Sequence, residues 1–149
     1  MAKARGILWL FVLAAFVVTP FIFDFRYPLS ILRKGERLVN IDLAQLKKMQ
    51  AANDIQLIDV REPVELEEAG RIPGATNIPL GDVEEAFLMD SETFFKTYNI
   101  KKPKKSDANI VFTCRSGVRS LRAVKIVEEL GYKPLNFKDG YLGWANQEL

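Results

Sequence analysis

The chain has 149 residues, 48% of them apolar, which is enough for one domain with a sizeable buried core and one additional segment. Its formal net charge of +2 comes from residues 1–39, which hold six of the 21 Lys and Arg residues and two of the 19 acidic ones, so residues 40–149 have 15 basic and 17 acidic residues. A mildly acidic domain gives no support for nucleic-acid binding, and the absence of histidine excludes a Ser-His-Asp triad, a Cys-His dyad and a His-ligated metal.

An uncharged apolar stretch at residues 7–23 follows Lys3 and Arg5 near the N-terminus. As a helix these 17 residues would extend roughly 25 Å, close to the hydrocarbon thickness of a thin bilayer. We therefore expect residues 1–25 to anchor the chain in a membrane as a single-pass hydrophobic helix; a cleaved secretory signal and a mitochondrial leader are the alternatives. Residues 26–39, which contain Pro28, Ser30 and Gly35, are predicted to be a linker.

Helical and strand-like segments alternate along residues 40–149. Asn40 is predicted to cap a helix that continues to residue 52. Short apolar runs predict strands over 55–60, 77–79, 109–113 and 134–137. Further helices are predicted over 63–69, 83–89, 91–98, 120–130 and 143–149, and residues 139–140 as a turn. This alternation is typical of a three-layer α/β domain with a mostly parallel central sheet of about four or five strands, flanked by helices.

The single cysteine, Cys114, follows the apolar run 110–112 and precedes Arg115-Ser116-Gly117-Val118-Arg119-Ser120. A thiol beside two guanidinium groups and near a helix N-terminus is favoured as the thiolate. Because the chain has no histidine to take the proton, backbone N–H groups, the helix end and the arginines would have to stabilise that thiolate. Gly117 would let the loop turn so that its N–H groups converge on one point and form an anion-binding nest. The plainer interpretation, a small buried apolar residue, leaves the surrounding arginines and serines unexplained.

Asp59 and Arg61 follow another predicted strand. Because the carboxyl ends of parallel strands meet at one edge of a sheet, we expect both residues to share a pocket with Cys114. Asp59 is expected to organise loop N–H groups rather than to transfer protons. Arg61 could instead form a surface ion pair with Glu62, which would contribute little to stability. Tyr141 is expected to be a core contact of the last helix.

Three blocks occur in order: Asp59-Val60-Arg61-Glu62-Pro63, then Gly-Arg-Ile-Pro-Gly-Ala-Thr-Asn-Ile-Pro at residues 70–79, then Cys114 to Ser120. Gly131-Tyr132 and Asp-Gly-Tyr-Leu-Gly-Trp at residues 139–144 follow them. Together these segments resemble the rhodanese (thiosulfate sulfurtransferase) domain family over residues 40–149. The resemblance implies a rhodanese-like fold and an enzyme that needs no metal or organic cofactor.

The activity implied by the resemblance is transfer of sulfane sulfur from a small-molecule donor such as thiosulfate to a thiol or cyanide acceptor. By motif position Cys114 would be the catalytic nucleophile and would carry the sulfur as a persulfide. The backbone N–H groups of Arg115, Ser116, Gly117, Val118 and Arg119 would hold the persulfide, Arg115 or Arg119 would bind the anionic end of the donor, and Asp59 and Arg61 would line or brace the pocket.

The same motifs are compatible with two other functions. One is a non-catalytic rhodanese-like module that binds partners or senses persulfides. The other is a cysteine-based phosphatase or arsenate reductase. Related phosphatases separate their cysteine and arginine by five residues, whereas four residues separate Cys114 from Arg119. The smaller ring fits a lone sulfur atom better than a phosphate, and the chain lacks a second thiol.

Overall fold

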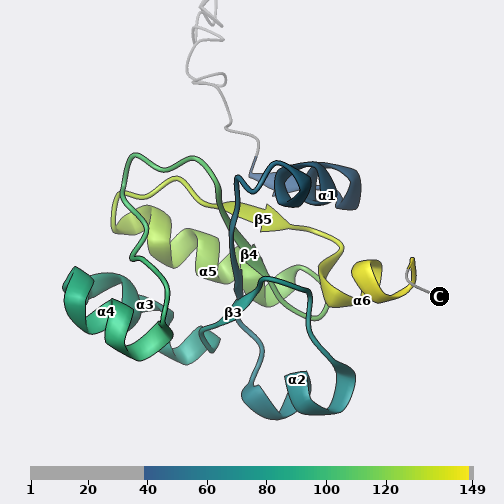
Figure 1. Cartoon of the computed structure of the whole chain (residues 1–149), viewed down its shortest axis with the longest axis horizontal. Helices are drawn as coiled ribbons and strands as arrows, with labels where there is room; N and C mark the ends of the chain where they lie inside the picture. Colours follow the sequence, from purple (N-terminus) through teal and green to yellow (C-terminus); the bar gives the residue numbers. More distant parts are fainter. Residues whose placement is uncertain (1–38, 148–149) are drawn as a thin grey trace, which may run out of the picture. The chain divides into compact units, whose positions relative to one another are not determined.

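The computed structural model describes residues 39–147 (Figure 1). The predicted hydrophobic segment 1–25, the linker up to residue 38 and residues 148–149 lie outside the described residues. Within residues 39–147, none of the helices combines the length and apolar character that crossing a bilayer requires. The membrane anchor proposed for residues 7–23 therefore stays a prediction.

Five strands form one sheet in the order β1-β5-β4-β2-β3, and every neighbouring pair is parallel. Their bounds are β1 Asn40–Ile41, β2 Gln56–Asp59, β3 Thr76–Asn77, β4 Ile110–Thr113 and β5 Leu135–Phe137. The central strand β4 is buried along its whole length, as expected for a parallel sheet that is covered on both faces. Asp59 pairs with Thr113 in the β2–β4 register, so the residues that follow both strands lie at one edge of the sheet.

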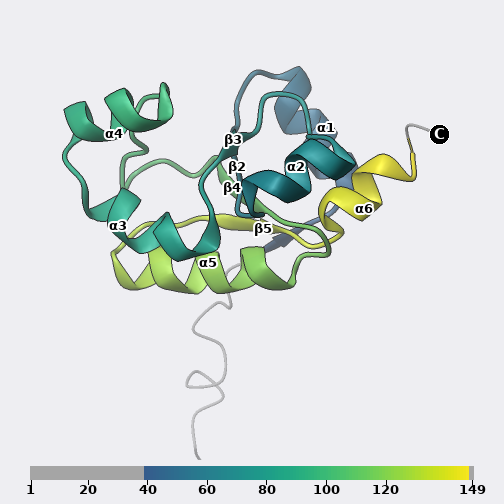
Figure 2. The ribbon, with the colours of Figure 1, turned by 90° about the horizontal axis from the view of Figure 1, so that it is seen from below.

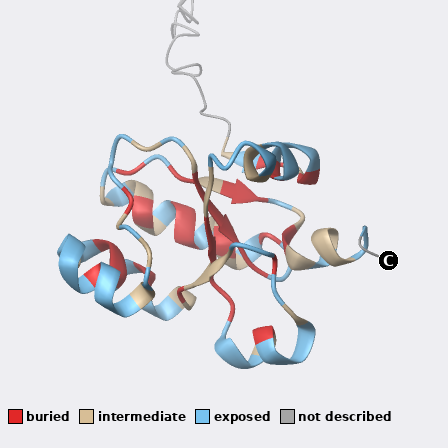
Figure 3. Cartoon of the chain, viewed as in Figure 1, coloured by how far each residue is buried: buried red, intermediate tan, exposed pale blue. Residues whose placement is uncertain are grey.

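Helices cover both faces of the sheet. Their bounds are α1 Leu43–Ala51, α2 Pro63–Ala69, α3 Val83–Leu88, α4 Ser91–Tyr98, α5 Val118–Glu129 and α6 Gly140–Ala145, and a 3₁₀ turn spans Leu80–Asp82. On one face Ile58 and Phe112 pack with α3, α4 and α5, while on the other Leu57 and Val111 pack with α1. Successive strand residues alternate between the two clusters, as the pleat requires. Figure 2 shows α5 and α1 on opposite sides of the sheet, and Figure 3 shows that the buried residues concentrate on the strands and the inner side of α5. The predicted three-layer α/β fold is confirmed.

The prediction that Asn40 caps the first helix is wrong. Asn40 lies in β1, opposite Asn136 of β5, and its side-chain oxygen accepts a hydrogen bond from Asn136 Nδ2 at 2.8 Å. The N-cap of α1 is Asp42, whose carboxylate accepts the N–H of Gln45 at 2.9 Å, while the Gln45 side chain accepts the N–H of Asp42 at 3.0 Å. Ile41 belongs to the same buried cluster as α1, which is why the strand and the helix looked like one helical pattern.

Other boundaries differ from the predictions. β3 spans Thr76–Asn77 rather than residues 77–79, although the N–H of Ile78 still donates to the carbonyl of Asp59 at 3.0 Å. Helix α5 begins at Val118 rather than at residue 120, directly after the turn at Gly117. Helix α6 begins at Gly140 rather than at residue 143, so Asp139 lies in the turn before the helix, as predicted, while Gly140 is the first helical residue.

Candidate active site

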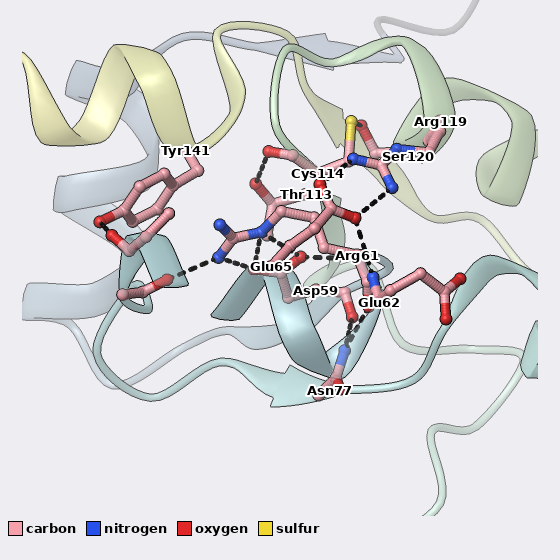
Figure 4. A network of polar contacts seen from close by, with 12 residues as sticks. Asp59, Arg61, Glu62, Glu65, Asn77, Thr113, Cys114, Arg119, Ser120 and Tyr141 are labelled. Carbon is pink, nitrogen blue, oxygen red and sulfur yellow. Dashed lines mark hydrogen bonds and ion pairs between the residues drawn. The ribbon is translucent and has the colours of Figure 1, made fainter. Parts of the chain in front are cut away.

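Cys114 lies at the carboxyl end of β4, where the chain turns into α5 (Figure 4). Its side chain is buried, with 1% of the residue exposed. Asp59 ends the neighbouring strand β2, and Arg61 follows two residues later. The structure therefore brings Cys114, Asp59 and Arg61 to one edge of the sheet, as the sequence predicted.

Residues 114–117, which we call the Cys114 loop, join β4 to α5, and the carbonyl groups of Cys114 and Arg115 in this loop point towards α6. The N–H of Tyr141 donates to the carbonyl of Cys114 at 2.7 Å, and the N–H of Leu142 donates to the carbonyl of Arg115 at 3.0 Å. In a planar trans peptide the N–H points opposite to the C=O. The N–H groups of Arg115 and Ser116 therefore point away from α6, to the inner side of the loop.

Two glycines make this loop geometry possible. Gly117 has a φ of 81° and Gly140 a φ of 58°, both in the left-handed region that side chains disfavour. A Cβ atom at position 117 would overlap the carbonyl of Lys138, and one at position 140 would overlap the carbonyls of Cys114 and Arg115. Any larger residue at either position would therefore push the Cys114 loop and α6 apart.

The Cys114 sulfur is surrounded by hydrogen-bond donors. The Ser120 hydroxyl lies 3.4 Å from Sγ, and backbone N–H groups of Ser120, Ser116 and Arg119 also donate to the sulfur. Burial is the largest single influence and raises the pKa of Cys114, but these donors together outweigh it, so the net pKa of the thiol is lowered. The fully buried Ser120 was not predicted as a site residue, although it closes the motif in the sequence. An enclosed thiolate of this kind can act as a nucleophile.

Arg119 is bound to a glutamate that the sequence analysis missed. Its two terminal nitrogens donate to the two carboxylate oxygens of Glu65 at 2.6 and 2.7 Å. This hydrogen-bonded pair lowers the pKa of Glu65 to about 2 and raises the pKa of Arg119. Nothing in the sequence pattern assigns Glu65 to Arg119, because Glu65 is one of several glutamates on α2.

Arg61 forms a buried ion pair with Asp59, so a surface pair with Glu62 is the wrong interpretation. Its Nη2 lies 2.7 Å from Asp59 Oδ2, Nε donates to both carboxylate oxygens, and the residues are 1% and 0% exposed. Asp59 also accepts the backbone N–H of Arg61 at 3.0 Å. These contacts satisfy two charges that burial would otherwise destabilise strongly. Asp59 thus organises the loop that follows its own strand.

Further contacts of Arg61 tie α2 and α6 to this pair. Arg61 Nη2 donates to the carbonyl of Gly70 at 3.0 Å, just after α2. The guanidinium lies 4.2 Å from the ring centre of Tyr141, and the Tyr141 hydroxyl donates to the carbonyl of Ala69. Tyr141 is therefore more than the core contact that the sequence predicted, because it also covers the Asp59–Arg61 pair.

A small cavity of about 130 Å³ lies beside this network. Its lining residues come from the loop after β2, from α2, from the Cys114 loop and from α6: Arg61, Glu65, Glu68, Ala69, Arg115, Tyr141 and Leu142. Two larger hollows of about 410 and 610 Å³ are lined by residues such as Gln56, Asn109 and Gln50, and neither includes a residue of the Cys114 loop. Of these three hollows, only the small cavity includes a residue of the Cys114 loop, Arg115. Arg61 also lines it, whereas Asp59 and Cys114 do not, so the predicted pocket is shared by Arg61 and the neighbour of the nucleophile.

Residues 39–147 contain no group of three or more His, Cys, Asp or Glu side chains arranged to hold a metal ion.

Comparison with known proteins gives a consistent result. The model of the rhodanese-like domain family matches residues 42–147. A mouse protein named thiosulfate sulfurtransferase/rhodanese-like domain-containing protein 3 is 41% identical over 106 residues, covering 70% of this chain and 67% of that protein. The human thiosulfate:glutathione sulfurtransferase is 37% identical over 109 residues, covering 72% and 94%. A solved human single-domain sulfurtransferase is 36% identical with a TM-score of 0.71 and covers 74% of this chain and 98% of that structure.

Proposed function

We propose, from the premise that this chain belongs to the rhodanese-like domain family, that it is a thiosulfate sulfurtransferase that carries sulfane sulfur as a persulfide on Cys114. The observation that carries the proposal is the enclosure of the Cys114 sulfur by the Ser120 hydroxyl and by N–H groups of Ser116, Arg119 and Ser120. These donors favour the thiolate that must attack, and they can also stabilise the anionic outer sulfur of a persulfide.

In the first half-reaction the Cys114 thiolate attacks the outer sulfur of thiosulfate. A new S–S bond forms to Cys114, the S–S bond of thiosulfate breaks, and sulfite leaves with the electron pair of that bond. The protein is left with a persulfide anion, so charge is conserved. The loop N–H groups hold the thiolate before the attack and the persulfide after it.

We assign the anionic end of the donor to Arg115 rather than to Arg119. The guanidinium of Arg61 is already paired with Asp59, and that of Arg119 with Glu65. Arg115 is exposed, lines the small cavity and makes no side-chain hydrogen bond or ion pair with any residue between 39 and 147. A free guanidinium next to the nucleophile is suited to bind a sulfonate-like group.

In the second half-reaction a thiolate from solution attacks the outer sulfur of the Cys114 persulfide. The S–S bond to Cys114 breaks, the Cys114 thiolate leaves, and the acceptor becomes a persulfide. Relatives from human and yeast are named thiosulfate:glutathione sulfurtransferases, which supports a thiol acceptor here. Because Cys114 is the only cysteine, the acceptor must come from outside the chain.

The proposal is tested by incubating the purified full-length protein with thiosulfate and measuring the mass of the intact chain. We expect a gain of one sulfur atom on Cys114, release of sulfite, and thiocyanate formation when cyanide is added. Cys114→Ser should abolish all three signals. A wild-type protein that gains no sulfur from thiosulfate or any other sulfane donor would contradict the proposal and favour the non-catalytic binding module.

For localisation we propose that residues 7–23 attach the enzyme to a membrane. The support is their apolar, uncharged sequence, preceded and followed by basic residues.

A further inference from the structure

The cavity beside the Cys114 loop contains two charged groups of opposite sign that the fold does not use. Four charged side chains line it: Arg61, Glu65, Glu68 and Arg115. Arg61 is held by Asp59, and Glu65 by Arg119. Over the part of the chain that the structure describes, neither Glu68 nor Arg115 makes a side-chain hydrogen bond or ion pair. The cavity therefore presents one available carboxylate and one available guanidinium.

The two charges lie on different elements that face the same space. Glu68 belongs to α2, and Arg115 to the loop that follows β4. Contacts already described fix both elements: the Glu65–Arg119 pair holds α2 against the first turn of α5, and the N–H of Leu142 holds the carbonyl of Arg115. The backbone that carries Glu68 and Arg115 is therefore already ordered before a ligand binds. This lowers the entropic cost of binding a ligand between the two charges.

We propose that this cavity selects acceptor thiols that carry both an ammonium and a carboxylate group, with the carboxylate on Arg115 and the ammonium on Glu68. Thiols of the amino-acid type, such as cysteine, have this chemistry. The inference rests on the proposed sulfurtransferase function and specifies the acceptor class for it. A volume of about 130 Å³ suits an amino-acid-sized group, so a longer thiol would extend out of the cavity.

Glu68 has opposite effects on the two half-reactions. Thiosulfate carries only negative charge, so the Glu68 carboxylate repels it while Arg115 attracts it. An acceptor with an ammonium group is attracted by both residues. Glu68 is therefore a specificity-determining residue: it weakens donor binding slightly and strengthens the binding of zwitterionic acceptors.

The experiment uses the full-length protein, loaded with sulfur by thiosulfate and freed of excess donor. Loading is first verified by the mass gain of one sulfur atom. The loaded protein is then mixed with each of four thiols, and the second-order rate constant for loss of the Cys114 persulfide is measured. Cysteine carries both charges, cysteamine only the ammonium, 3-mercaptopropionate only the carboxylate and 2-mercaptoethanol neither. Each rate constant is divided by that for 2-mercaptoethanol in the same variant, which cancels changes in persulfide reactivity.

Glu68→Gln should lower the relative rate constants for cysteine and cysteamine by about threefold to fivefold, as expected for one partly exposed ionic contact, and leave that for 3-mercaptopropionate unchanged or higher. The same variant should be loaded faster than wild type at low thiosulfate concentration. Arg115→Gln should lower the relative rate constants for cysteine and 3-mercaptopropionate and spare cysteamine. Glu67→Gln is the matched control, because Glu67 is exposed on the same helix and does not line the cavity.

The proposal is overturned if Glu68→Gln changes all four rate constants in proportion, or if Glu67→Gln reproduces its pattern, since either result means general electrostatics rather than a binding site. Failure of thiosulfate to load Cys114 is seen before any acceptor is added. That result would overturn the proposed function and this proposal with it, and it is distinguishable from a loaded protein that does not discriminate among the thiols.

Discussion

Glu65 and Arg119 are 54 residues apart in the sequence, and their side chains meet in a two-point ion pair with distances of 2.6 and 2.7 Å. Glu65 lies on α2, while Arg119 lies in the first turn of α5, beside the nucleophile. The pair therefore ties α2 to the start of α5, directly after the Cys114 loop. It also removes Arg119 from the cations that are available to a substrate, although the sequence motif alone made Arg119 and Arg115 equal candidates.

Glu65→Gln should lower the free energy of unfolding by about 1 kcal/mol, because the two-point ionic contact becomes a weaker neutral one. The effect is limited because the two side chains are 32% and 27% exposed, so water screens the pair. Chemical denaturation of wild type and variant at neutral pH measures the difference. Glu67→Gln, a surface change on the same helix, should leave the unfolding free energy within a few tenths of a kcal/mol, about the size expected of a surface substitution. Equal stabilities for wild type and Glu65→Gln would show that the pair contributes nothing.

The contribution of Glu65 should disappear in acid. Its pKa falls from an ordinary value of 4.5 to about 2 in the folded protein, because Arg119 hydrogen-bonds the charged form. A folded pKa below the unfolded one means that stability is present above pH 4.5 and is lost as the pH falls towards 2. The difference in unfolding free energy between wild type and Glu65→Gln should therefore be constant above pH 5 and shrink between about pH 4.5 and 2. A difference that persists unchanged at pH 2 would contradict this assignment.

The sequence predicted elements well where a local signal marks their ends. Helix α2 begins at Pro63, which suits a first helical turn, and α4 begins after Asp90, whose carboxylate accepts the N–H groups of Glu92 and Thr93. Both helices have the predicted bounds. The two-residue strand β1 has no such signal, because only its pairing with β5 makes it a strand.

The sequence predicted where the candidate site lies in the fold, but not which charged side chains form ion pairs there. Asp59 and Arg61 are two residues apart, so their side chains lie on the same side of an extended chain. The side chain of Glu62, the next residue, lies on the opposite side. This spacing favours the Asp59–Arg61 pair over an Arg61–Glu62 pair. The deciding factor is that Asp59 and Arg61 are both buried, which was not evident from the sequence. The pairing of Glu65 with Arg119 could not be predicted at all, because only the tertiary fold brings α2 next to the start of α5.

Gly117→Ala should be more damaging than a substitution at a glycine that has the same backbone conformation but open surroundings. Gly74 is that control: its φ is 78°, and nothing lies within 4 Å of a Cβ added there. Gly74→Ala should lower the unfolding free energy by about 1 kcal/mol, the cost of a left-handed alanine. Gly117→Ala meets the Lys138 carbonyl as well, so we expect a loss of at least about 2 kcal/mol and a large drop in sulfur transfer. Equal effects of the two changes would show that the close approach of α6 to the loop is unimportant.

Removal of residues 1–38 should release the protein from membranes if residues 7–23 are an anchor. Full-length and shortened chains, both tagged at the C-terminus, are expressed in cells, and their membrane fractions are extracted with alkaline carbonate. The full-length chain should stay in the pellet and the shortened chain in the supernatant. Recovery of the intact full-length chain in the supernatant would contradict the anchor, and a shorter mature chain would indicate a cleaved signal or leader instead.

Ser120→Ala should raise the pKa of Cys114, because the variant loses the hydroxyl that hydrogen-bonds the thiolate from 3.4 Å while the thiol stays buried. Sulfur transfer should then need a higher pH, since only the thiolate attacks the donor. The pH dependence of Cys114 alkylation by iodoacetamide measures the thiolate fraction, and its midpoint should move to higher pH in the variant. Ser116→Ala is the matched control, because Ser116 acts on the sulfur through its backbone N–H, which alanine retains. If both variants keep the wild-type midpoint, the backbone N–H groups alone set the pKa of the thiol, and the Ser120 hydroxyl has no part in activating it.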